Sequence, residues 1–322
     1  MASVQYHGEP SLQLKDSDLE PRDKWIELGR GAFSVVYKTF CNLHNVDVAV
    51  KEIKRGNERH EIQKLVTLSP HNHVVKIKAV LEMSGGKTGI VMEFCDYGLQ
   101  SLRDKLGRNF IPWPRCLLFM QHIMSGLQFL HRNNITHRDL KPENVMVTNS
   151  FTCKIADVGL AKAYHSKSNS SSNTQVFCPS GTPFYISPER WKRPTAVGTQ
   201  TDDIYSCGIL FYKMITNADL FYMERMAQDE SFFSMLKMYV VDEKYRPETS
   251  ELDKGTTLAP PIVKAVISTC WDAKPENRKT FDYWTSLLRQ EIAKTYTDEV
   301  IREADEELRQ LVRGSFDDNR FY

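Results

Sequence analysis

The sequence lacks the features that would place it in a membrane or in an oxidising compartment. None of its apolar runs approaches the length of about 18 residues that a membrane-spanning helix needs. The first ten residues, MASVQYHGEP, contain neither the apolar segment of a signal peptide nor a glycine at position 2 for acylation. The seven cysteines form no C-x-x-C pair and no short metal-ligand spacing, which is typical of reduced thiols. We therefore expect a cytoplasmic protein, with the nucleus as the alternative.

An excess of charge of either sign is also missing. The 322 residues include 42 lysines and arginines and 41 aspartates and glutamates, so the formal net charge is +1. This balance argues against a general surface for nucleic acids or acidic membranes, although it does not exclude a local basic pocket. With 41% apolar and 26% charged residues, the composition is typical of a globular protein with about two packed units.

Glycines and hydrophobic periodicity divide the chain into regions. Residues 1–23 are polar and look like a leader without a core of its own. Over residues 24–95, strands are predicted in WIELGRGAFSVVYKTF, VDVAVKEI, VVKIKAVLEM and TGIVMEF, and a helix in HEIQKLVTL. Over residues 96–290, helical periods dominate in RCLLFMQHIMSGLQFLHRN, DIYSCGILFYKMIT and PPIVKAVISTCW. This order predicts a small sheet-rich unit followed by a larger, mostly helical one.

The last region, residues 291–322, is expected to contain one long amphipathic helix in EIAKTYTDEVIREADEELRQLVRG. Its apolar residues recur every four positions: Ile292, Tyr296, Val300, Ala304 and Leu308. Either the helix packs along the helical unit, or residues 291–313 dock a partner or a second copy. About three heptads are marginal for an autonomous coiled coil.

The stretch HRDLKPEN, residues 137–144, is densely polar although the apolar runs LQFLH and VMV flank it. A buried polar group without a partner costs roughly 1–3 kcal/mol, and an unpaired charge costs more. Filling a core with such a cluster would therefore be costly. The pattern indicates that these side chains bind something charged.

Two motifs of the sheet-rich region are typical of phosphate binding. Gly29 and Gly31 begin the pattern G-x-G-x-x-G-x-V, in which Ser34 replaces the third glycine. Glycines let backbone N–H groups approach phosphate oxygens closely, whereas the alternative is an ordinary tight turn. A strand is predicted after the glycines, where a dinucleotide-binding fold needs a helix. Lys51 ends the run VAVK, and Glu61 on the predicted helix is placed to hold it.

These motifs, together with DVG (157–159), GTPFYISPE (181–189), DIYSCG (203–208) and CWDAKPENR (270–278), resemble the eukaryotic protein kinase family. The resemblance covers residues 24–290 in the family's order. It implies an α+β, two-lobed kinase fold with a small β-rich N-lobe (24–95) and a larger, mostly helical C-lobe (96–290). The ending C-W-x-x-x-P-x-x-R is similar to tyrosine and tyrosine-kinase-like kinases, whereas HRDLKPEN and GTPFYISPE resemble the serine/threonine type. We therefore expect a serine/threonine kinase with tyrosine-kinase-like features.

The resemblance also implies catalytic and metal-binding roles, with ATP and Mg²⁺ as cofactors. Asp139 would orient the substrate hydroxyl and accept its proton. Lys141 would neutralise charge on the transferred phosphoryl group, and Lys51 would hold the ATP phosphates. Asn144 and Asp157 would hold magnesium, which prefers hard oxygen ligands.

The residues that the resemblance assigns to ATP binding are Gly29, Gly31, Ser34, Val36, Ala49, Lys51, Glu61, Met92, Glu93, Cys95 and Met146. Val36 and Ala49 would cover one face of adenine and Met146 the other. The backbones of Glu93 and Cys95 would read the edge of the base.

Other motif residues are expected to be structural. His137 would pack the loop against the core, Asp203 would support that loop, and Glu189 would pair with Arg278. The Ser/Asn-rich segment 164–177 would be a loop in which a phosphate could meet Arg138, or else a solvated linker.

The expected function is transfer of the γ-phosphoryl group of ATP to serine or threonine hydroxyls of protein substrates in signalling. The alternative is a nucleotide-binding pseudokinase or scaffold. Ser34 and Val158, which stands where the family commonly has Phe, are the departures that keep this alternative open. The presence of all the expected charged residues favours the enzyme.

Overall fold

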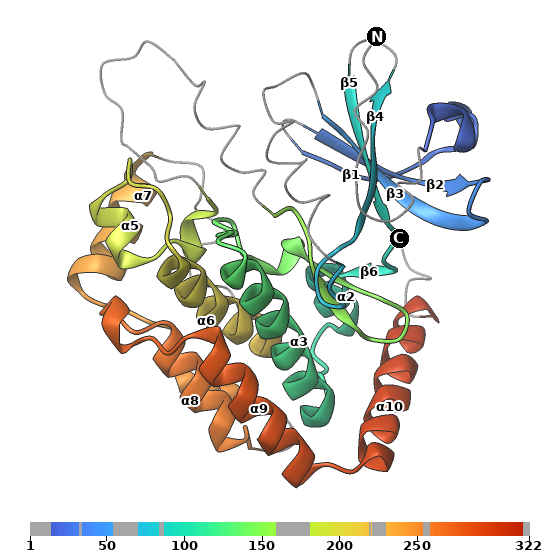
Figure 1. Cartoon of the computed structure of the whole chain (residues 1–322). Helices are drawn as coiled ribbons and strands as arrows, with labels where there is room; N and C mark the ends of the chain where they lie inside the picture. The colour runs from blue at the N-terminus through green and yellow to red at the C-terminus, as the bar shows by residue number, and fades with distance from the viewer. Residues whose placement is uncertain are drawn as a thin grey trace. The chain divides into compact units, whose positions relative to one another are not determined.

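The computed structural model describes residues 14–31, 34–53, 70–83, 87–158, 181–218, 220, 230–253 and 258–317 (Figure 1). The chain divides into two compact units. The first unit comprises Met1–His71 and Val75–Cys95, and the second comprises Asn72–Val74 and Asp96–Tyr322. Each unit is described separately below.

The first unit is built on an antiparallel five-stranded sheet with the strand order β1-β2-β3-β5-β4. Its strands are β1 (Ile26–Arg30), β2 (Ser34–Cys41), β3 (Val46–Ile53), β4 (Ile77–Met83) and β5 (Lys87–Glu93). These strands confirm the four β-rich runs expected from the sequence. The helix expected in HEIQKLVTL lies outside the described residues.

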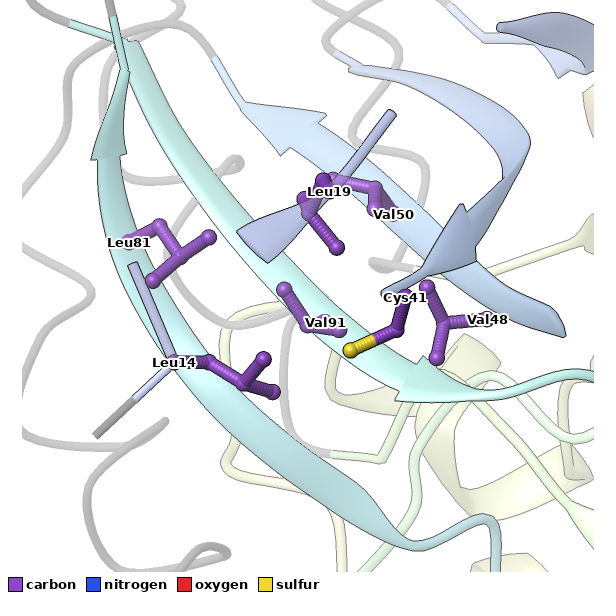
Figure 2. Packing of buried hydrophobic residues seen from close by; sticks show 7 residues of the cluster. All are labelled: Leu14, Leu19, Cys41, Val48, Val50, Leu81 and Val91. Carbon is purple, nitrogen blue, oxygen red and sulfur yellow. The ribbon is translucent and has the colours of Figure 1, made fainter. Parts of the chain in front are cut away.

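One face of this sheet carries a compact hydrophobic core (Figure 2). The buried side chains are Leu14, Leu19, Cys41, Val48, Val50, Leu81 and Val91. Leu14 and Leu19 precede the first strand, and Leu19 forms an isolated antiparallel bridge with Cys41. The view of residues 1–23 as a leader without a core therefore misses two leucines that complete the core of the sheet. Their acidic and polar neighbours conceal them in the composition.

Arg22 fastens this leading segment to the sheet. Its guanidinium carbon lies 4.2 Å from the ring centroid of Trp25 and 3.9 Å from that of Tyr37. The same group forms a 2.9 Å ion pair with Glu52 of β3. Cation–π contacts and an ion pair with a buried partner together fix the position of the segment.

The second unit is mostly helical and includes a three-stranded sheet of order β6-β7-β8. The strands are β6 (Tyr97–Gly98), β7 (Val145–Val147) and β8 (Cys153–Ile155). The helices are α2 (Leu99–Leu106), α3 (Trp113–Arg132), α5 (Pro188–Lys192), α6 (Gln200–Thr216), α7 (Glu230–Lys237), α8 (Pro261–Cys270), α9 (Phe281–Thr295) and α10 (Asp298–Asp317). Helices α3, α6 and α8 confirm the three helical periods of the sequence. Within the described residues, no helix is both long enough and apolar enough to cross a membrane.

The expected single helix near the C-terminus is in fact two helices. Helix α9 ends at Thr295, and Tyr296 has extended backbone angles (φ −125°, ψ 131°). The Thr297 hydroxyl then accepts a 3.3 Å hydrogen bond from the N–H of Val300 in the first turn of α10. This cap starts a new helix, so the four-residue apolar spacing continues across a break that the pattern alone does not reveal.

Candidate active site

The polar loop 137–144 is anchored to α6 by one buried carboxylate, that of Asp203, which is 1% exposed. Its Oδ2 accepts a 2.8 Å hydrogen bond from the backbone N–H of His137, and its Oδ1 accepts one of 2.9 Å from Arg138. The Nε2 of His131 lies 2.8 Å from the same Oδ2. The expected role of Asp203 as a support for the loop is confirmed.

Two residues of the candidate site have positive φ angles, which residues other than glycine rarely adopt. The φ angle is 72° at Arg138 and 55° at Asp157. Such conformations cost on the order of 1–3 kcal/mol each and persist only where the surroundings impose them. At Arg138 the hydrogen bond from its N–H to Asp203 supplies part of this support.

The Asp139 carboxylate is surrounded by donors from three other residues. Its Oδ1 accepts hydrogen bonds from the backbone N–H of Thr182 (3.0 Å) and from the Thr182 hydroxyl (2.9 Å). Its Oδ2 lies 3.3 Å from Lys141 Nζ and accepts a 3.3 Å hydrogen bond from Asn144 Nδ2. Lys141 also donates to the Thr182 hydroxyl at 2.8 Å. The structure thus brings together Asp139, Lys141 and Asn144, three of the residues named from the sequence.

These donors determine the ionisation of Asp139. Burial by itself raises the pKa of the carboxyl group, but the charge of Lys141 and the hydrogen bond from Thr182 outweigh burial and lower the pKa below its ordinary value. The carboxylate is therefore ionised at neutral pH, and it can accept a proton from a group brought against it.

His137 is fully buried and links Asp139 to the strand before Asp157. Its Nε2 donates to the carbonyl oxygen of Ala156 at 2.8 Å, and its Nδ1 accepts from the N–H of Asp139 at 3.3 Å. A ring proton on Nε2 and a lone pair on Nδ1 satisfy both bonds. The side chain therefore has a packing and bridging role, as expected.

Asn144 and Asp157 flank the β7–β8 hairpin in sequence, so both lie at its open end, away from the connecting loop. The N–H of Ala156 donates to the carbonyl oxygen of Asn144 at 2.9 Å, which joins the two ends. Asn144 Nδ2 donates to the carbonyl oxygen of Asp139 at 2.7 Å, which leaves Oδ1 as the amide atom able to bind a cation. One amide oxygen and one carboxylate are hard ligands, and no group of three His, Cys, Asp or Glu side chains suited to a metal occurs within the described residues. This donor set fits a magnesium ion that keeps water and phosphate oxygens as its other ligands.

In the first unit, four of the residues assigned to ATP share one face of the sheet. Val36 is paired directly with Lys51, and Ala49 with Met92. Because side chains alternate along a strand, all four lie on the face opposite the Leu14 and Leu19 core. The Lys51 side chain is buried, with 6% exposure.

Close packing of the described residues does not require glycine at positions 29 and 31. Among the described residues, a Cβ atom added to Gly29 would meet nothing within 4 Å, and one added to Gly31 would meet only the Ser34 carbonyl oxygen at 3.8 Å. Neither glycine has a positive φ. The Gly31 N–H donates to the Ser34 carbonyl oxygen at 2.9 Å, which closes the turn into β2. Space for a close approach is thus left open above both glycines.

The remaining residues assigned to ATP occupy ordinary structural positions. The Glu93 backbone N–H donates to the Lys76 carbonyl oxygen at 3.0 Å, and the Glu93 carboxylate accepts from the Lys76 N–H at 2.7 Å. Cys95 is buried, and Met146 is the central residue of β7 in the second unit. Glu61 and Gly159 lie outside the described residues, as does the segment 164–177.

Sequence reasoning did not assign Thr182 a role at Asp139. Thr182 contributes two of the hydrogen bonds to that carboxylate and accepts a third from Lys141. The motif G-T-P places a hydroxyl forty-three positions after Asp139. Only the fold shows that the two residues are in contact, although the motif GTPFYISPE had already drawn attention to Thr182.

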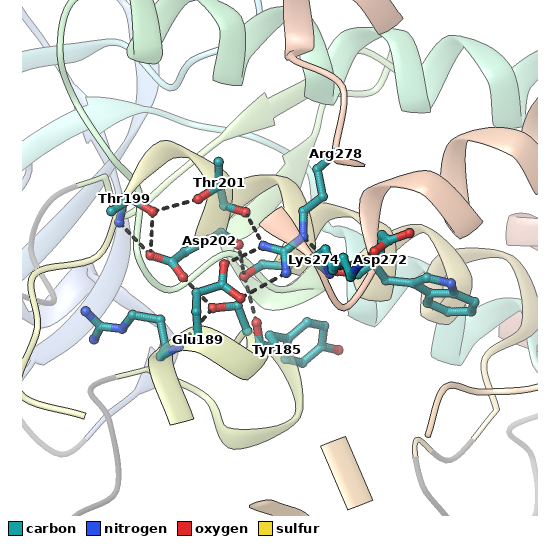
Figure 3. A network of polar contacts seen from close by, with 12 residues as sticks. Tyr185, Glu189, Thr199, Thr201, Asp202, Asp272, Lys274 and Arg278 are labelled. Carbon is teal, nitrogen blue, oxygen red and sulfur yellow. Dashed lines mark hydrogen bonds and ion pairs between the residues drawn. The ribbon is translucent and has the colours of Figure 1, made fainter. Parts of the chain in front are cut away.

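The expected ion pair of Glu189 and Arg278 is confirmed and belongs to a larger polar network (Figure 3). Arg278 binds the Glu189 carboxylate with both terminal nitrogens, at 2.5 and 2.9 Å. It also donates to the carbonyl oxygens of Thr201 (3.0 Å) and Asp272 (2.9 Å). The bidentate geometry joins α5 to the segment before α9.

Comparison with known families decides the identity of this fold. The model of the protein kinase domain matches residues 23–292. The chain belongs to the protein kinase domain family. This kinase domain combines the N-terminal antiparallel five-stranded sheet and the mostly helical region of that fold, as the motifs had indicated.

The domain is distantly homologous to receptor-interacting serine/threonine kinases. Human receptor-interacting serine/threonine-protein kinase 3 is 26% identical over 284 residues, which cover 85% of this chain and 52% of that protein. The human kinase 1 of the same name is 27% identical over 286 residues, covering 84% and 40%. Rat kinase 3 is 27% identical over 293 residues, covering 87% and 58%. The chain thus spans about half the length of the relatives it matches.

Proposed function

We propose that this kinase domain is catalytically active and transfers the γ-phosphoryl group of ATP to serine or threonine hydroxyls of protein substrates. The observation that carries the proposal is the surroundings of Asp139. Thr182, Lys141 and Asn144 all point donors at its carboxylate, which keeps it ionised. A scaffold that only bound nucleotide would have no use for an ionised base in this position.

The residues of the chain divide the reaction between them. Asp139 accepts the proton of the substrate hydroxyl while that oxygen forms its bond to the γ-phosphorus and the bond to the bridging oxygen of ADP breaks. Lys141, 3.3 Å from Asp139, neutralises charge on the transferred group. Asn144 and Asp157 would hold magnesium, which would supply positive charge to screen the phosphates.

Residues of the first unit, together with Met146 of the second, are proposed to bind the nucleotide. Lys51 and the backbone at Gly29 and Gly31 would hold phosphates, since no described residue packs closely above these glycines. The remaining assignments to ATP are Ser34, Val36, Ala49, Glu61, Met92, Glu93, Cys95 and Met146.

Arg138 supports a proposal about regulation. Its Nε is buried and has no hydrogen-bond partner among the described residues, and it lines a cavity together with Arg190 and Gly198. We propose that a phosphate on the segment 164–177 pairs with Arg138 and orders this segment. The candidate acceptors are Ser166, Ser168, Ser170, Ser171, Ser172 and Thr174.

Incubation with radiolabelled ATP, magnesium and a generic protein substrate tests the proposal, with phosphoamino-acid analysis of the product. We expect labelled phosphoserine and phosphothreonine. Phosphotyrosine as the main product would overturn the serine/threonine specificity. Absence of any transfer, from protein that binds nucleotide, would favour the pseudokinase.

A further inference from the structure

Helix α10 begins after residue 292, where the match to the family model ends, yet it is integrated into the second unit. It packs against α2 and α3 (Figure 1). Ala304, Leu308 and Val312 are buried along its apolar face. Its opposite face carries exposed charges such as Glu303 and Glu307. The apolar face is therefore already covered within the chain, which argues against the alternative of a docking helix.

Arg115, in the first turn of α3, connects α10 to the β7–β8 hairpin. Its Nη2 forms an ion pair with Asp305 of α10, and its Nη1 donates to the carbonyl oxygen of Phe151 at 3.3 Å. The side chain of Arg115 is 6% exposed, and that of Asp305 is 16% exposed. A buried guanidinium needs a counterion, so Asp305 is what allows Arg115 to occupy this position.

Phe151 is contacted by arginines of both α3 and α10. It lies in the loop between β7 and β8, is 2% exposed, and has a φ of 57°. The guanidinium carbon of Arg115 lies 5.9 Å from its ring centroid, and that of Arg309 of α10 lies 5.4 Å away. A positive φ is unfavourable for an aromatic residue and needs support from its surroundings. The two arginines supply that support.

The other end of the same hairpin carries the proposed metal ligands. Asn144 immediately precedes β7, and Asp157 follows β8 by two residues. Between tip and base the strands are paired in register, from Val147 with Cys153 to Val145 with Ile155. Each strand has only three residues, so the tip lies close to the base.

We infer that α10 positions the metal-binding residues of this kinase. The Asp305–Arg115 ion pair and the Arg309 guanidinium hold Phe151, and the hairpin transmits this restraint to Asn144 and Asp157. Arg115, Asp305 and Arg309 are thus positioning residues, because they act through the hairpin. The inference rests on the proposed function for its consequence on magnesium, but the mechanical coupling stands on the contacts alone.

The first test compares Asp305→Asn with Glu307→Gln in the full chain. Both remove one carboxylate charge from α10, but Glu307 is exposed on the outer face. Amide hydrogen exchange without nucleotide is measured over residues 144–157, with α6 as the reference. We expect exchange in the hairpin to rise several-fold in Asp305→Asn, with α6 unchanged and the control like the wild type. Unchanged exchange in the hairpin, or an equal rise of exchange in α6, would overturn the inference that α10 holds the hairpin.

The second readout is the magnesium concentration that gives half-maximal nucleotide binding. We expect it to rise about threefold or more in Asp305→Asn and to stay constant in Glu307→Gln, with binding restored at saturating magnesium. A general loss of folded protein would not shift this concentration. A looser hairpin with an unchanged magnesium requirement would contradict the positioning role. If the wild type shows no magnesium-dependent nucleotide binding, the proposed function fails, and so does the predicted effect of α10 on magnesium binding. Hydrogen exchange still tests whether α10 holds the hairpin in place.

If Asp305→Asn does not fold, a second pair of variants applies the same readouts. Arg309→Met removes the charge over the Phe151 ring and keeps most of the side chain, and Arg313→Met on the exposed side of α10 is its control. Increased hairpin exchange only in Arg309→Met is expected. Equal exchange in the two variants would overturn the inference.

Discussion

The Asn144 side chain donates a hydrogen bond of 2.7 Å to the backbone carbonyl oxygen of Asp139, and its Nδ2 lies 3.3 Å from the Asp139 carboxylate. The proposed metal ligand and the proposed base are therefore parts of one hydrogen-bonded unit. A change at Asn144 must alter the ionisation of Asp139 as well as metal binding.

Asn144→Asp should shift the pH dependence of phosphoryl transfer. In the wild type the pKa of Asp139 is lowered, so the base is lost only when the pH falls well into the acid range. A second carboxylate in place of the Nδ2 donor favours the protonated form and raises the pKa of Asp139. We expect the acid limb of the rate profile to move to higher pH. The exposed Asn134→Asp is the control, and coincident profiles for all three proteins would contradict the coupling.

Lys51→Met and Asp157→Asn should each abolish phosphoryl transfer while leaving the fold intact. The Lys51 side chain is buried, so truncation to alanine would also leave a gap. Methionine fills most of that volume and removes only the charge. The rate of transfer and the unfolding midpoint are measured on the same preparations. Activity retained in either folded variant would remove that residue from the mechanism.

The elements of the fold were largely predictable, because each strand and helix of the core buries a periodic set of apolar residues. The alternation in VDVAVKEI and the helical period before HRDLKPEN are confirmed by β3 and α3. The break at Tyr296 was not predictable, since this residue fits the apolar spacing although its backbone is extended. Leu14 and Leu19 were concealed for the opposite reason, because isolated leucines in a polar segment show no period.

The candidate site was predictable by residue type but not by contact. The charge density of HRDLKPEN indicated a binding cluster, and the resemblance to the protein kinase family singled out Asp139, Lys141 and Asn144 within it. The approach of Thr182 to Asp139 depends on chain folding across forty-three positions, which no local pattern encodes. The link from Arg115 to Asp305 spans an even longer separation and involves a helix beyond the kinase motifs.

Arg278→Met should destabilise the second unit without entering the chemistry. The Arg278 side chain is fully buried, and its loss leaves the Glu189 carboxylate without its bidentate partner. Breaking such a pair costs about 3–5 kcal/mol. Urea unfolding of this variant is compared with that of the exposed control Arg289→Met. A difference between the two of under about 1 kcal/mol, the range of surface pairs, would show that the pair contributes little.

Val158 should disfavour the arrangement in which Asp157 turns away from the phosphates. Val158 is buried, stiff at χ1 and smaller than the phenylalanine common in the family. Its burial in a flipped segment would therefore gain less free energy. We expect inhibitors that require the flipped state to bind weakly to the wild type and more tightly to Val158→Phe. Inhibitors that compete with ATP in the unflipped state should bind both alike. Tight binding of the first class to the wild type would contradict this account.

The most direct test of the central claim is Asp139→Asn, measured for both turnover and ATP affinity. Asparagine keeps the shape of the side chain but cannot accept the substrate proton as a carboxylate does. Transfer from radiolabelled ATP is expected to fall by several orders of magnitude, while the affinity for ATP with magnesium stays within a few-fold of the wild type. Transfer by the variant at the wild-type rate, or a loss of ATP affinity equal to the loss of rate, would contradict the role of Asp139 as the base.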